Sequence, residues 1–78
     1  MLMSWSERIT FNPAVMGGKP CIRGMRVTVG TIVGLIAAGR SEEEILLAYP
    51  NLELADLRAA LAYAALRSEE SELPLATE

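Results

Sequence analysis

Basic side chains gather in the first half of this chain, at spacings that could form one binding surface. Lys19, Arg23 and Arg26 lie within eight residues of one another, and Arg40 follows. An arginine guanidinium binds carboxylate or phosphate through two parallel hydrogen bonds, so this set could grip a phosphate backbone or enter the carboxylate-lined active site of a metal-dependent nuclease. The segment could instead be a solvated loop, with Arg26 packed against helix-end carbonyls or Glu side chains. These four residues are the candidate set for binding a partner or nucleic acid.

Other features resemble catalytic motifs but lack the rest of each pattern. Residues 17–19 read Gly-Gly-Lys, yet Pro20 follows where a phosphate-binding loop needs Ser or Thr. Cys21 has no His and no second Cys in the chain to act with it as a nucleophile or a metal site. The three glutamates at 42–44 diverge by about 100° per residue on a helix, so they cannot converge on one metal ion. We therefore expect a protein that is not an enzyme and that holds no metal or cofactor.

The charge of the chain is unevenly distributed. The net charge is −3, but residues 8–41 hold five basic residues and no acid, whereas residues 42–78 hold nine acids and two basic residues. Such an asymmetry indicates an oriented interaction in which the basic half meets an acidic partner.

The elements that position the basic residues begin with an irregular arm at residues 8–27. Residues 8–11 alternate polar and apolar side chains, which predicts a short strand. The paired glycines at 17–18 predict a tight turn, and the segments 21–22 and 25–27 are expected to be extended.

Helical periodicity begins at Thr28, the expected N-cap of the first helix. Apolar residues at 29, 32, 33 and 36 form one helix face, and Gly39 is the expected stop. Ser41 and Glu44 have the spacing of a capping box, which predicts a second helix that ends before Pro50.

The third helix is expected to start near Glu53 or Leu54 and to end near Ser68. Its inner apolar face comprises Leu54, Leu57, Leu61, Ala64 and Ala65. A second apolar face comprises Ala59, Ala62, Tyr63 and Leu66. A domain this small cannot cover both faces, so the second face is the expected homodimer interface.

These elements predict one domain of mainly α class, in which a short N-terminal β arm precedes a three-helix bundle. We expect an N-terminal extension at 1–7, the domain at 8–68 and an acidic disordered tail at 69–78. The single cysteine excludes an internal disulfide, and the first residues lack the basic and apolar regions of a signal peptide. No apolar run is long enough to span a membrane, so the expected location is the cytoplasm.

The chain resembles the domain-of-unknown-function family 433 over about three quarters of its length. The residues that carry the resemblance are Asn12-Pro13, Gly17-Gly18-Lys19-Pro20-Cys21-Ile22-Arg23-Gly24-Met25-Arg26, Gly39, Ser41-Glu42-Glu43-Glu44, Tyr49-Pro50 and Ala59-Ala60-Leu61-Ala62-Tyr63-Ala64-Ala65. Two positions depart from the family pattern. Met25 stands in place of the usual Thr, and Glu53 stands where a capping Thr or Ser is common, so the start of the third helix is expected to be less well capped.

The resemblance implies a helix-turn-helix-like bundle and a role as a VapB-like antitoxin. Such an antitoxin would bind a PIN-like ribonuclease toxin and, in regulating its own synthesis, its promoter DNA. The alternative is a protein-interaction adaptor with no nucleic-acid role. In both cases the expected protein is a homodimeric binding module.

Overall fold

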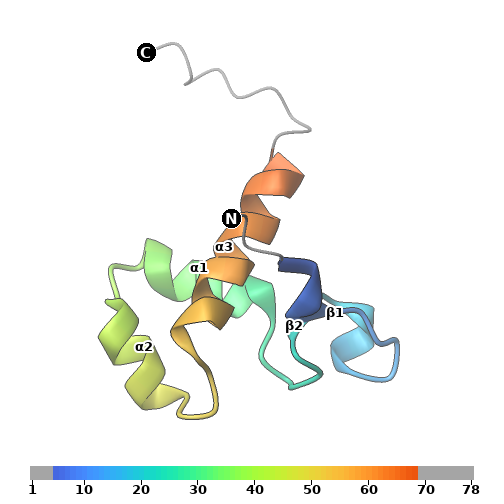
Figure 1. The fold of residues 1–78 in the computed structure, drawn as a ribbon, viewed down its shortest axis with the longest axis horizontal. Coiled ribbons are helices and arrows are strands. Elements are labelled where there is room, and N and C mark those ends of the chain that lie inside the picture. The colour runs from blue at the N-terminus through green and yellow to red at the C-terminus, as the bar shows by residue number, and fades with distance from the viewer. Residues whose placement is uncertain (1–4, 69–78) are drawn as a thin grey trace.

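The structure is a computed structural model that describes residues 5–68, in which a small β hairpin precedes three helices (Figure 1). The predicted mainly α fold with an N-terminal β arm is thereby confirmed. The elements are β1 (Ile9–Thr10), β2 (Cys21–Ile22), α1 (Val29–Ala37), α2 (Glu42–Ala48) and α3 (Leu54–Ser68), with short 3-10 helices at Trp5–Glu7 and Met16–Gly18.

The β hairpin is short because turns interrupt it on both sides. β1 and β2 pair antiparallel, with Ile9 opposite Ile22. Residues 8 and 11, which were expected to extend the first strand, lie outside it. Arg23 and Gly24 both have positive φ, at 44° and 76°, and the amide of Met25 donates to the carbonyl of Ile22. Positive φ at both central residues is the requirement of a type I′ turn, which reverses the chain directly after β2.

The helix boundaries follow the caps that the sequence predicts. The Thr28 hydroxyl accepts a hydrogen bond from the amide of Thr31 and starts α1. Ser41 and Glu44 form both hydrogen bonds of the capping box at the start of α2. Gly39 has φ of 93°, a conformation that suits glycine after a helix end.

The hydrophobic core lies where α1 and α3 pack together against the hairpin and α2. Its fully buried side chains include Ile22, Ile32 and Leu57, and Ile45 contributes the buried residue of α2. The short 3-10 helix at Trp5–Glu7 packs on α3, so these residues of the expected extension contact the domain.

The orientation of α3 differs from the expected one. Ala59 is fully buried in the core of the same chain, so its assignment to a homodimer interface is wrong. Leu54 and Leu61, expected to face inward, are 38% and 37% exposed. The buried face is centred on Asp56, Leu57 and Ala60 instead, a rotation of roughly one residue, or about 100°, around the helix axis.

The acidic segment 69–78 and residues 1–4 lie outside the described residues. Within residues 5–68, no helix is long and apolar enough to cross a membrane.

Candidate functional site

The most connected charged residue in the described domain is Asp56, in the first turn of α3. Its side chain is fully buried, although it carries a carboxylate. An unpaired buried charge is costly, so the carboxylate must be neutralised by its neighbours. Those neighbours come from the hairpin and from the segment between α2 and α3.

Arg23 binds this carboxylate through two of its nitrogen atoms. Its Nε lies 3.0 Å from Oδ1 of Asp56, and its Nη2 lies 2.8 Å from Oδ2. The same Nη2 donates to the carbonyl oxygen of Asn51 at 2.8 Å. The guanidinium therefore joins the turn after β2 to the connection that precedes α3.

Arg8, which precedes β1 and lies opposite Arg23 across the hairpin, contacts the same carboxylate. Its Nη1 donates to Oδ1 of Asp56 and to Oε1 of Glu53, both at 2.8 Å. The backbone amide of Glu53 donates to Oδ2 of Asp56 at 2.8 Å. Asp56, three residues after Glu53, thus supplies one of the two hydrogen bonds of a capping box at the start of α3.

This environment decides the protonation of Asp56. Burial alone would raise the pKa of the carboxyl, but hydrogen bonds from Arg23, from the backbone of Glu53 and from Arg8 outweigh it. The pKa of Asp56 therefore lies below its ordinary value, and the carboxylate is charged at neutral pH. Two arginines and two carboxylates compose the cluster, so its formal charge is zero.

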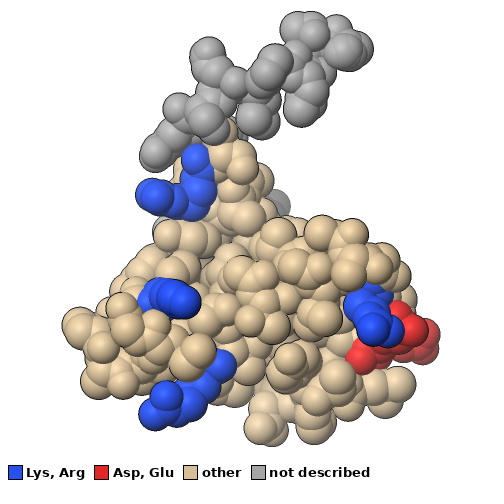
Figure 2. All heavy atoms as spheres, turned by 180° about the vertical axis from the view of Figure 1, so that it is seen from behind, with Lys and Arg blue, Asp and Glu red and all other residues tan. Residues whose placement is uncertain are grey.

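The predicted basic set is therefore divided between two roles. Arg23 is held by Asp56, whereas Lys19, Arg26 and Arg40 are exposed and make no ion pair with a described residue. Figure 2 shows basic side chains at separate places on one face and acidic ones only at one edge. The basic side chains visible on that face do not form one continuous patch.

Two adjoining hollows lie where Arg26 and Arg40 are found. The first, of about 230 Å³, lies between α1 and α2, and the second, of about 380 Å³, lies between the segment 25–27 and the connection after α2. They share Ala48 and Tyr49. We call the pair the α2 groove; its remaining lining residues are Leu35, Arg40, Glu44 and Ile45 in the first hollow and Met25, Arg26, Val27, Pro50, Asn51 and Leu52 in the second.

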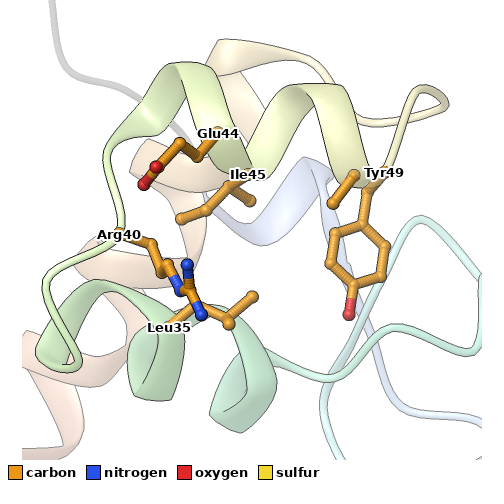
Figure 3. A pocket seen from close by; sticks show the side chains of 6 residues that line it. Leu35, Arg40, Glu44, Ile45 and Tyr49 are labelled. Carbon is orange, nitrogen blue, oxygen red and sulfur yellow. The ribbon is translucent and has the colours of Figure 1, made fainter.

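The α2 groove combines an apolar lining with a cation in each hollow. Figure 3 shows Arg40 and Glu44 at one end of the first hollow, Tyr49 at the other and Ile45 between them. Glu44 is already engaged by the amide of Ser41, whereas Arg40 is available. Such a surface suits an apolar segment that carries carboxylates, because apolar contact and charge pairing are offered together.

The structure also gives roles to residues that the sequence analysis did not select. In the sequence, Arg8 and Asp56 contribute only to the charge balance of the two halves. In the structure, both belong to the ion-pair cluster around the buried carboxylate. Tyr49 packs against the core and also lines both hollows. The sequence signal for the cap at the start of α3 is the spacing of Asp56, which lies three residues after Glu53, the residue just before α3. In a capping box, the side chain at this position accepts a hydrogen bond from the backbone amide of the residue before the helix.

The remaining residues of the expected homodimer face lie on the distal half of α3. Leu66 is 43% exposed, and Ala62 and Tyr63 are partly buried. The ring of Tyr63 packs on that of Phe11, with centroids 5.8 Å apart. Half of the Phe11 side chain remains exposed, so an apolar surface continues from α3 onto the hairpin.

Cys21 is buried and forms no disulfide. Within residues 5–68, no group of three or more His, Cys, Asp or Glu side chains is placed to hold a metal ion.

Comparisons with known proteins cover most of this domain. The uncharacterized protein y4eO of Sinorhizobium fredii is 41% identical over 58 residues, which are 74% of this chain and 26% of that protein. The crystal structure of a DUF433 member from Anabaena variabilis is similar with a TM-score of 0.75 and 36% identity, over 81% of this chain and 62% of that chain. The chain thus spans about a quarter of the length of the curated relative it matches.

A match to a protein family covers the same region. Residues 9–64 match the family described as Protein of unknown function (DUF433). This region holds the hairpin, α1, α2 and most of α3, together with Asp56 and the α2 groove. Because the match extends over more than half of the sequence, the chain belongs to the DUF433 family.

Proposed function

We propose that this chain is a non-catalytic protein-binding module whose α2 groove receives an acidic segment of a partner. The observation that carries the proposal is the position of Arg26 and Arg40, one in each hollow, exposed and without an ion pair in the described domain. An interfacial arginine that becomes desolvated beside a carboxylate contributes far more than a solvated one.

The partner class we propose is a PIN-like ribonuclease, which makes this chain antitoxin-like. Such a nuclease binds its metal with several carboxylates, so the mouth of its active site is negative. The charge of the groove supports this pairing, and so does the resemblance drawn from the Gly-Gly-Lys-Pro segment and the Tyr49-Pro50 pair. An adaptor that binds another acidic protein would use the same surface.

The test compares the affinity of arginine variants for the partner. The product of the adjacent gene is co-purified with this chain, and the dissociation constants of Arg26→Ala and Arg40→Ala are measured by calorimetry. Each should weaken binding by about 30-fold or more, whereas the exposed control Arg67→Ala should change it by less than about fivefold. Equal affinities for all three variants would remove the groove from the interface.

Promoter DNA is a second proposed partner, which the three helices would bind as a helix-turn-helix unit. The acids Glu53 and Asp56 at the start of α3 would repel phosphates, but both contact Arg8, and Asp56 is fully buried. That neutralisation supports an approach of α3 to DNA. Lys19 and Arg26 would then contact phosphates.

Salt dependence tests this second proposal. The logarithm of the binding constant for promoter DNA should fall linearly with the logarithm of salt concentration, and Arg26→Ala should reduce the slope by about one. A binding constant that does not change with salt, or no binding at low salt, would contradict it.

We also propose that the chain forms a homodimer through the outer surface of α3. The support is the exposed Leu66 together with Ala62 and the Phe11–Tyr63 ring pair, which form an apolar surface that the described residues leave partly exposed.

A further inference from the structure

We infer that the acidic segment at residues 69–78 of one copy of this chain docks in the α2 groove of a second copy. The segment reads Glu-Glu-Ser-Glu-Leu-Pro-Leu-Ala-Thr-Glu, so acids precede two leucines. This composition complements the groove, whose lining is mainly apolar and whose exposed charges include Arg26 and Arg40.

The segment offers two leucines, one for each hollow of the groove. Pro74 disfavours a helical backbone at Leu73 and so favours an extended path there. In an extended path, residues two apart point to the same side, so Leu73 and Leu75 face one surface together. The two hollows adjoin at Ala48 and Tyr49, so neighbouring leucines can occupy both, with acids of the segment on either side of the leucine pair.

Chain length places this contact between two copies. The groove borders the connection that leads into the N-terminal end of α3, and the acidic segment follows the C-terminal end, which points away from α2 (Figure 1). The 15 residues of α3 span about 22 Å. The five residues from Ser68 to Leu73 reach at most about 18 Å, which is less than the length of α3, so Leu73 falls short of the N-terminal end of α3, beside which the second hollow lies.

The inference rests on the proposed function only in that it uses the same groove. The acidic segment of a second copy would occupy this groove until a partner displaced it, so self-association and partner binding would compete. The direct test needs no partner, and its failure is therefore distinguishable from failure of the proposed function.

The test measures binding of a fluorescently labelled peptide of residues 69–78 to the full chain by anisotropy. The peptide should bind, and the double variant R26E/R40E should weaken binding by about tenfold or more. The control R58E/R67E has the same net charge and should differ from the unmodified chain by only about twofold. A peptide with Leu73 and Leu75 replaced by Ser should also lose affinity, because the apolar contact is removed.

Charge reversal on both sides provides the decisive comparison. A peptide with Glu69, Glu70 and Glu72 replaced by Lys should bind R26E/R40E more tightly than it binds the unmodified chain. In the full chain, L73S/L75S should raise affinity for the labelled peptide, because the competing segments are weakened. Absence of peptide binding at millimolar concentration, equal weakening by both double variants, or no rescue by the lysine peptide would each overturn the inference.

Discussion

At the scale of single residues, the fold depends on a carboxylate that is both buried and charged. Asp56 accepts hydrogen bonds from Arg8, Arg23 and the backbone of Glu53, and the buried side-chain polar atoms of the described domain all have partners. The cluster holds Arg23 in a left-handed backbone conformation that costs a non-glycine residue roughly 1–2 kcal/mol. The side chain of Arg23 therefore couples the turn after β2 to the start of α3 and to the loop at Asn51.

Replacing Asp56 by Asn should lower the free energy of unfolding by about 2–4 kcal/mol at pH 7, because two arginines lose their charged partner. The expected loss is below that of a wholly buried pair, since Arg8 and Arg23 are about one third exposed and water can reach them. Urea denaturation followed by circular dichroism measures this loss.

The pH dependence of that difference follows from the lowered pKa of Asp56. A carboxyl whose pKa is lower in the folded state stabilises the protein fully above its unfolded pKa, near 4, and the stabilisation disappears as pH falls through the folded pKa. The stability difference between the unmodified chain and Asp56→Asn should thus be constant from pH 7 to about 5 and shrink below pH about 4. A difference that persists unchanged at pH 3 would contradict the assigned protonation.

At the scale of elements, local sequence signals predicted the bounds of the helices well, but they predicted poorly which face of α3 is buried. The Thr28 cap and the Ser41–Glu44 capping box depend on neighbouring residues, so the sequence specifies them directly. The rotation of α3 depends on which of two apolar faces meets α1, and periodicity alone does not decide between them. Ala59 was therefore assigned to the surface, although a small residue there lets α3 approach the rest of the core closely.

Dependence on residues far apart in the sequence also explains why the ion-pair cluster at Asp56 was not predicted. Arg8 and Arg23 lie 48 and 33 residues before Asp56, so no local pattern links them. The sequence showed a basic arm and an acidic second half, and this asymmetry suggested only an external partner. Some of these charges instead pair within the chain, which leaves Lys19, Arg26 and Arg40 as the members of the predicted set that make no ion pair among the described residues.

The proposed homodimer is an element-scale prediction about the outer surface of α3. In the L73S/L75S background, which weakens docking of the acidic segment, Leu66→Glu places a charge on the apolar surface, so the mass measured by light scattering at tens of micromolar should fall to that of a monomer. The control Arg58→Glu makes a charge change on the same helix and should leave the mass unaltered. A monomeric mass for the unmodified chain would exclude this interface.

At the scale of the whole molecule, the domain separates the cluster that stabilises it from the surface proposed to bind. The Asp56 cluster ties the hairpin to α3, whereas the α2 groove lies between α1, α2 and the segment 25–27. Asn51 belongs to both, since its carbonyl accepts from Arg23 and it lines the second hollow. The ion-pair cluster around the buried Asp56 carboxylate therefore holds one wall of the groove in place.

Amide hydrogen exchange of the chain, alone and bound to the co-purified partner, tests the proposed binding surface most directly. If the α2 groove is the interface, added protection should concentrate in residues 25–27 and 40–52, and the distal half of α3 should exchange as it does without partner. The variant R26E/R40E should lose that protection, and the charge-matched R58E/R67E should retain it. Protection confined to the outer surface of α3 or to the hairpin, with the groove residues unchanged, would contradict the proposal.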